Sequence, residues 1–123
     1  MRLHGEEHEK TVIAASNYAR GLANLQRFEE AKALLRKTMP VARRVLEEGH
    51  HLILTMRWTY AAALYDNTGA TLDDLREAAT TLEDAERIAR RVLGGAHPTT
   101  AGMEGALRAV RAALRARDAP GSA

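Results

Sequence analysis

The chain has 123 residues, of which 46% are hydrophobic and 4% aromatic, with a formal net charge of +2 and no cysteine. These values fit one modest domain, and the dominance of alanine, leucine, arginine and glutamate favours packed helices over pleated sheets. The small net charge argues against a nucleic-acid partner, and the lack of cysteine excludes disulfides, thiolate catalysis and cysteine-ligated zinc.

Targeting signals are absent from the printed sequence. Residues 1–10 are rich in histidine and glutamate and lack the apolar stretch of a signal peptide. No later run approaches the roughly 20 apolar residues of a membrane-spanning helix. We therefore expect a cytoplasmic protein with no membrane span.

The spacing of apolar side chains predicts an all-α fold. The expected helices cover residues 10–26, 28–47, 52–68, 74–93 and 99–117. In the first of them, the expected core stripe consists of Ala15, Tyr18, Ala19, Leu22 and Leu25. In the second, it consists of Ala31, Leu34, Leu35, Ala42, Val45 and Leu46.

Proline and glycine mark the expected breaks. Pro40 lies inside the second helix, where its missing N–H and its ring predict a kink that costs about 3 kcal/mol. Gly94 and Gly95 end the fourth helix, and Pro98 suits the first turn of the fifth. Residues 69–74 combine glycine, threonine and aspartate, which predicts a long connection between the third and fourth helices.

The sequence repeats itself at helix-pair length. A shift of 42 residues places His8 on His50 and Tyr18 on Tyr60, and a shift of 47 places Leu35 on Leu82 and His50 on His97. The five additional residues fit the connection at 69–74. A period of this size is typical of stacked helical repeats.

Several short segments resemble the kinesin light chain type of tetratricopeptide repeat. The matching residues are Asn17-Tyr18-Ala19, Leu22, Arg27-Phe28-Glu29-Glu30-Ala31, Leu35, Val45-Leu46, His50, Leu93-Gly94 and His97-Pro98-Thr99-Thr100. The chain departs from the family pattern at Gln26, where glycine is usual, at His51, which replaces a proline, and at Thr59, which replaces an asparagine.

The resemblance implies an α-solenoid of antiparallel helix pairs. Residues 1–117 would form one domain, with repeats at about 8–49 and 50–96 and a half repeat at 97–117 that caps the C-terminal end, followed by a disordered tail at 118–123. In this family the first helices of the pairs line a concave groove that holds peptides or partner helices. The implied function is a protein-binding scaffold and not an enzyme, with no cofactor.

Projected onto this sequence, the family geometry predicts ten groove residues. They are Ser16, Asn17, Arg20 and Asn24 in the first repeat and Thr55, Trp58, Thr59, Ala62, Tyr65 and Asp66 in the second. For Trp58, two interpretations remain open, because an aromatic side chain outside the core stripe can anchor a ligand or can cover a neighbouring helix.

The histidines do not predict a metal site. His8, His50 and His97 recur at repeat-length spacing, so we expect each to cap or pack against a nearby turn. No nucleophile lies in a recognisable pattern with a base, and Gly94-Gly95 lacks the lysine and hydroxyl of a phosphate loop.

Two alternative functions remain. About three repeats are generally needed for stability, so two and a half can self-assemble as homo-oligomers through open ends or by exchanging helices. The other alternative rests on charge, because residues from Arg87 onward contain 7 basic and 2 acidic side chains. This basic last helix, with Arg108 and Arg111, either caps the solenoid or captures an acidic partner, nucleic acid or an anionic membrane surface.

Overall fold

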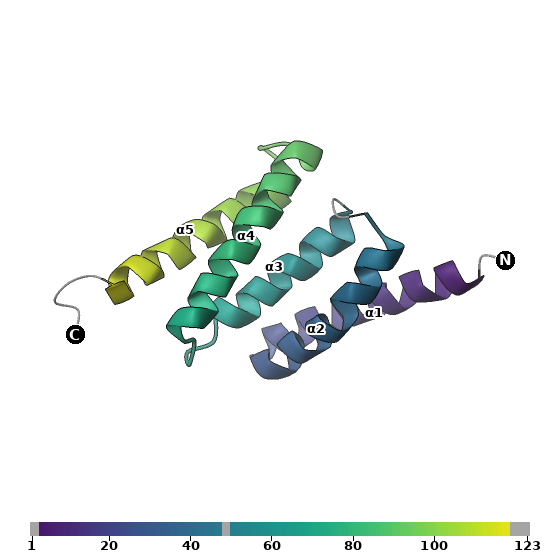
Figure 1. Cartoon of the computed structure of the whole chain (residues 1–123), viewed down its shortest axis with the longest axis horizontal. Coiled ribbons are helices and arrows are strands. Elements are labelled where there is room, and N and C mark those ends of the chain that lie inside the picture. Colours follow the sequence, from purple (N-terminus) through teal and green to yellow (C-terminus); the bar gives the residue numbers. More distant parts are fainter. Residues whose placement is uncertain (1–2, 48–49, 119–123) are drawn as a thin grey trace.

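The computed structural model describes residues 3–47 and 50–118, and this part of the chain is entirely helical apart from its connections (Figure 1). The five helices are α1 (Leu3–Asn24), α2 (Phe28–Val45), α3 (His51–Tyr65), α4 (Leu72–Leu93) and α5 (Pro98–Asp118). The all-α class and the five helices are confirmed.

The predicted start of the first helix is wrong by more than the usual uncertainty of helix ends. α1 begins at Leu3 instead of residue 10, so His8 lies within the helix and not in a loop before it. α5 ends at Asp118, one residue beyond the predicted end at 117. The rest of the expected disordered tail, residues 119–123, lies outside the described residues.

The helices pack in chain order, each against the next (Figure 1). α1 also contacts α3, and α3 contacts α5, whereas the backbones of α2 and α4 do not approach each other closely within the described chain. α1, α3 and α5 therefore form one layer, and α2 and α4 form the other. α3 is the centre of the molecule, and α1 and α5 lie at opposite ends of their layer.

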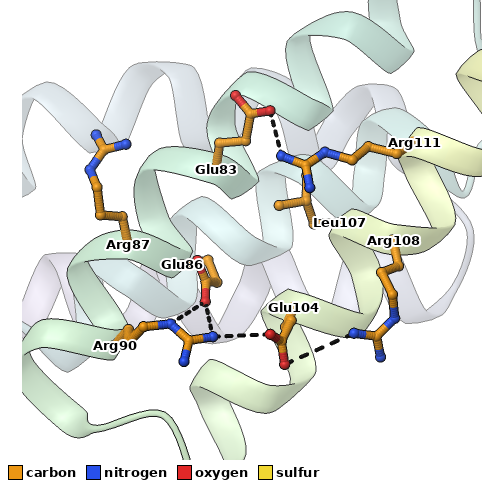
Figure 2. A pocket seen from close by; sticks show the side chains of 8 residues that line it. All are labelled: Glu83, Glu86, Arg87, Arg90, Glu104, Leu107, Arg108 and Arg111. Carbon is orange, nitrogen blue, oxygen red and sulfur yellow. Dashed lines mark hydrogen bonds and ion pairs between the residues drawn. The ribbon is translucent and has the colours of Figure 1, made fainter.

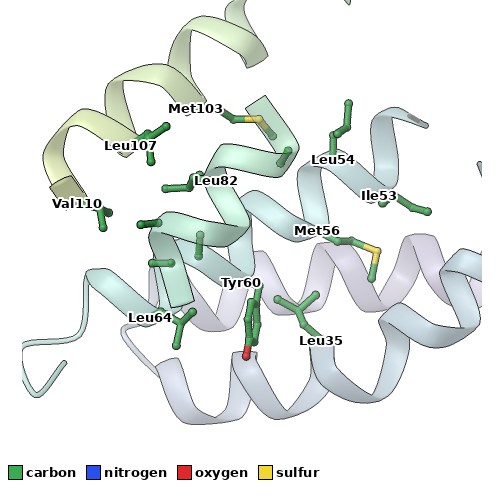
Figure 3. Close-up of a cluster of buried hydrophobic side chains, with 14 of the residues drawn as sticks. Leu35, Ile53, Leu54, Met56, Tyr60, Leu64, Leu82, Met103, Leu107 and Val110 are labelled. Carbon is green, nitrogen blue, oxygen red and sulfur yellow. The ribbon is translucent and has the colours of Figure 1, made fainter. Parts of the chain in front are cut away.

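One core runs between the two layers (Figure 3). Its fully buried large side chains come from all five helices and include Val12, Leu35, Ile53, Leu54, Met56, Leu64, Leu82, Met103 and Val110. α3 contributes the most, because α1, α2, α4 and α5 all contact it and leave little of its surface exposed to solvent. This is the pattern expected of a helix that is apolar on nearly all sides.

The predicted core stripe of the second helix is confirmed except at Val45, which is half-buried and outside the core, whereas that of α1 is wrong at two positions. Tyr18 and Leu25 are 62% and 68% exposed. The buried face of α1 consists of Val12, Ser16, Ala19 and Leu22. Tyr18 and Leu25 lie on a different face of α1, and no described helix packs against that face.

Pro40 does not interrupt α2, which runs continuously from Phe28 to Val45. Gln26, between α1 and α2, has a backbone φ of +63°. That left-handed conformation disfavours side chains other than glycine, which explains why a glycine is usual at this position in the repeats that the sequence resembles.

The helix starts use side-chain caps. The imidazole Nδ1 of His50 accepts a hydrogen bond from the Leu52 N–H at 3.0 Å, and that of His97 accepts from the Thr99 N–H at 3.1 Å. The expected capping role of these two histidines is confirmed. α4 begins with a full capping box, in which Thr71 and Asp74 each accept a hydrogen bond from the backbone N–H of the other.

No helix of the described residues is long and apolar enough to cross a lipid bilayer.

Candidate functional site: a groove along α1, α3 and α5

An open groove of about 410 Å³ lies along the layer formed by α1, α3 and α5. Its wall on the α1 side is made by Arg20, Ala23 and Asn24. Its floor on α3 follows one helical face, and α5 contributes Thr99. The residues from α3 are His51, Thr55, Trp58, Thr59 and Ala62.

Six of the ten predicted groove residues line this one groove. They are Arg20, Asn24, Thr55, Trp58, Thr59 and Ala62. They come from two helices that are adjacent in space but separated in sequence by α2.

The other four predicted residues do not line it. Ser16 is 2% exposed and belongs to the buried face of α1, so its prediction as a groove residue is wrong. Asn17 is exposed on α1 but lies outside the lining, as does Asp66, the C-cap of α3. Tyr65 is half-buried and packs against the core.

Trp58 both lines the groove and covers the neighbouring helix. A β-carbon placed on Gly102 of α5 would lie 2.2 Å from Cη2 and 2.7 Å from Cζ2 of the indole. The ring therefore rests directly on the bare α-carbon of Gly102, which only glycine allows. The two interpretations of Trp58 are thus compatible, because one side of the ring is held by α5 while the side chain remains half-exposed.

Tyr65 and Asp66 follow Trp58 along the chain, at the C-terminal end of α3. Burial raises the pKa of the Tyr65 hydroxyl, and the adjacent Asp66 carboxylate raises it further, whereas the Trp58 side chain opposes the rise. Tyr65 is accordingly a neutral hydrogen-bonding group at ordinary pH.

The polar groups of the groove are suited to hydrogen bonding and to a negatively charged ligand. The Thr59 hydroxyl donates to the Thr55 carbonyl at 3.0 Å, so that donor is used within α3. The Asn24 amide and the Thr55 hydroxyl are the further uncharged polar side chains on the α1 and α3 walls. Arg20 and His51 are the ionisable residues among the described lining side chains, and none of these is a carboxylate.

Sequence reasoning missed Ala23, His51 and Thr99. For His51 a signal was available, because His51, Thr55, Trp58 and Ala62 follow a four-three-four spacing that places them on one face of α3. Thr99 had no comparable signal, since its position depends on how α5 packs against α3.

A larger surface cleft, of about 510 Å³, lies between α4 and α5 (Figure 2). Its charged side chains neutralise one another. Arg90 pairs with Glu86 at 2.6 Å and with Glu104 at 3.0 Å, and Arg111 pairs with Glu83 at 2.8 Å. The pairs of Arg90 with Glu104 and of Arg111 with Glu83 join α5 to α4, so the cleft has a structural explanation.

The described residues contain no group of three histidine, aspartate or glutamate side chains placed to hold a metal ion. Comparison with known protein families, with curated proteins and with solved structures finds no significant match to this chain.

Proposed function

We propose that this protein is a scaffold that binds a peptide or helical segment of a partner protein in the groove along α1, α3 and α5. One observation carries the proposal: six residues chosen from the sequence as groove residues lie together around Trp58. In the same proposal, the five helices are two helix pairs and a final single helix of the kinesin light chain type of tetratricopeptide repeat. The recurrence of the sequence and the packing in two layers support it.

The chemistry of the lining favours a particular kind of segment. Trp58 offers an aromatic surface held in place by α5, and such rigid aromatics are common anchors at protein interfaces. Asn24 and Thr55 can hydrogen-bond a peptide backbone. Because Arg20 lines the groove and the described lining side chains include no carboxylate, we propose that the bound segment carries an acidic side chain or a terminal carboxylate.

The experiment is a selection of binding peptides from a random peptide library, followed by titration of the selected peptide while the fluorescence of Trp58 is recorded. Trp58 is the only tryptophan, so its signal reports on the groove. We expect Asn24→Ala and Arg20→Ala each to weaken binding by about tenfold, equivalent to about 1.4 kcal/mol.

Arg44→Ala is the matched control, because Arg44 is exposed on α2, in the other layer. Its affinity should equal that of the wild type. If Arg44→Ala and Arg20→Ala weaken binding equally, the peptide binds through general charge attraction and the groove proposal is wrong. If no peptide is enriched over a library exposed to no protein, the proposal is also wrong.

A further inference from the structure

α1 carries a second surface, separate from the groove. Its members follow a three-four-three-four spacing and therefore share one helical face. We call this surface the open stripe; it consists of Thr11, Ala14, Tyr18, Gly21 and Leu25. All five are exposed. Leu25 directly follows α1, and its N–H still donates to the Gly21 carbonyl at 3.1 Å, which keeps it in the helical path.

The corresponding positions of α3 and α5 are buried. The positions 42 residues after the first four members are Ile53, Met56, Tyr60 and Ala63, and all are at most 9% exposed. The positions another 47 residues on are Thr100, Met103, Leu107 and Val110, and these are at most 6% exposed. The same face is thus covered on two helices and uncovered on the third.

The helix that precedes each buried stripe covers it. On α3, Tyr60 is covered by Arg36 of α2, whose Nε donates to the Tyr60 hydroxyl at 3.1 Å and whose guanidinium lies 5.6 Å from the ring centre. Ala63 of α3 packs with Ala31 of α2. On α5, Leu107 and Val110 lie beside Leu82 of α4 (Figure 3). α1 packs only on α2 and α3 among the described helices, and neither reaches the open stripe.

We propose that the open stripe is an interface with a second copy of this chain, formed by two α1 helices that pack antiparallel. The stripe suits pairing with itself because large and small side chains alternate along it. When the two-fold axis passes between Ala19 and Arg20, Tyr18 lies over Gly21 of the other copy, and Leu25 lies over its Ala14. All five members are uncharged, so no like-charge repulsion opposes this contact.

The other end of the molecule favours a closed dimer over a filament. Among the side chains that the structure describes, the exposed large hydrophobic ones are Ile13, Tyr18 and Leu25, on α1 or at its end, and Val92, near the end of α4. The exposed face of α5 carries Arg108 and Arg115 instead. A head-to-tail stack would therefore set an apolar face against a charged one, whereas a two-fold dimer pairs apolar with apolar and is complete.

The first test is the solution mass of the full chain, measured by light scattering over a wide range of protein concentration. We expect the mass to double as the concentration rises, and Tyr18→Glu to raise the dissociation constant by at least about tenfold. Val92→Glu is the matched control, because Val92 is an equally exposed hydrophobic residue outside the stripe, and it should dimerise like the wild type.

Two results would overturn the proposal. One is a wild type that stays monomeric at every concentration, because the open stripe then does not pair two copies of this chain. The other is equal weakening by Tyr18→Glu and Val92→Glu, which would indicate non-specific association. Circular dichroism should show each variant to be folded, because both positions are exposed and neither change reaches the core.

The chain has no cysteine, so introduced cysteines test the antiparallel register directly. An equimolar mixture of Ala14→Cys and Leu25→Cys chains should form a disulfide between unlike chains under mild oxidation. A mixture of Ala14→Cys and Ala116→Cys, with the second cysteine on α5, should not. Crosslinking of Ala14→Cys to itself in preference to Leu25→Cys would contradict the antiparallel arrangement.

The proposed dimer interface and the proposed peptide-binding groove can be tested independently of each other. Tyr18→Glu should abolish the mass increase and leave peptide binding unchanged, since the groove residues of α1 lie on another face. Arg20→Ala and Asn24→Ala should weaken peptide binding and leave the mass unchanged.

Discussion

At the scale of single residues, the contact between Trp58 and Gly102 connects the groove to the fold. The indole is held where it is because α5 presents an α-carbon without a side chain. A groove aromatic that is supported from behind loses little conformational freedom when a ligand binds, and that favours affinity. The position of Trp58 therefore depends on one glycine of another helix.

We expect Gly102→Ala to displace Trp58 and to lower the free energy of unfolding by about 1 to 3 kcal/mol, as inserting a methyl group into a packed contact commonly does. Urea denaturation measures the stability, and a shift in the tryptophan emission maximum reports the displacement.

Gly105→Ala is the control within the same helix. An added β-carbon there meets only the Arg108 guanidinium, at 4.0 Å. Because alanine is the better helix former, Gly105→Ala should raise the stability by up to about 1 kcal/mol and leave the emission unchanged. If Gly102→Ala behaves in the same way, the close contact of the indole with α5 does not exist in solution.

At the scale of the helix, the start of α4 depends on its capping box. The Asp74 carboxylate accepts a hydrogen bond from the Thr71 N–H at 2.9 Å, and this bond holds the pKa of Asp74 below its ordinary value. The Thr71 hydroxyl accepts from the Asp74 N–H at 3.0 Å. The first turn of α4 is therefore capped at the end of the long connection from α3, and its start is well defined.

Thr71→Ala should lower the free energy of unfolding by about 1 kcal/mol, the usual effect of losing an N-cap side chain.

Asp74→Asn should lower the free energy of unfolding most at neutral pH. Because the native pKa of Asp74 is below the unfolded one, its charge stabilises the fold above the ordinary pKa of about 3.9 and ceases to do so as the pH falls through the native value.

The measurement is urea denaturation of the wild type and Asp74→Asn at a series of pH values. The difference between them should stay constant from about pH 7 to about pH 5 and shrink as the pH falls below about 4. Asp73→Asn is the control, since Asp73 lies on the exposed side of the same turn and pairs only with Arg76, at 3.4 Å. A difference for Asp74→Asn that does not vary with pH would rule out the charged cap.

At the scale of the whole molecule, the backbones of α2 and α4 stay apart within the described chain, and α3 packs against both of them. Tyr60 of α3 makes the polar part of this connection. Its hydroxyl accepts from Arg36 of α2 and donates to the Glu77 carboxylate of α4 at 2.6 Å. One buried side chain thus joins three helices that follow one another in sequence.

Tyr60→Phe should lower the free energy of unfolding by about 1 kcal/mol, because both hydrogen bonds are lost while their charged partners turn to solvent. Tyr18→Phe, at the corresponding position of α1, is the control and should have no measurable effect, since Tyr18 is 62% exposed. Both are measured by urea denaturation at the same low protein concentration. Equal effects of the two changes would show that the bridge through Tyr60 contributes nothing.

The sequence alone determined the elements and much of the groove. The spacing of apolar residues located five helices. Glycine, threonine and aspartate located the connection before α4, and the recurrence of His50 and His97 located two helix caps. These features depend on residues close together in the chain, so local periodicity and turn chemistry suffice to predict them. Six groove residues followed from the resemblance, because they lie on regular helical faces.

Only the tertiary structure decided which apolar face of each helix meets a neighbour. In α1, the stripe with Tyr18 and Leu25 and the face with Val12, Ser16 and Ala19 both have helical spacing, and nothing local distinguishes them. The packing of α2 and α3 buries the second face and leaves the first exposed. The same holds for Trp58 and Gly102, which are 44 residues apart. Periodicity shows that a face exists, whereas its neighbour depends on contacts between distant segments that form only when the whole chain folds.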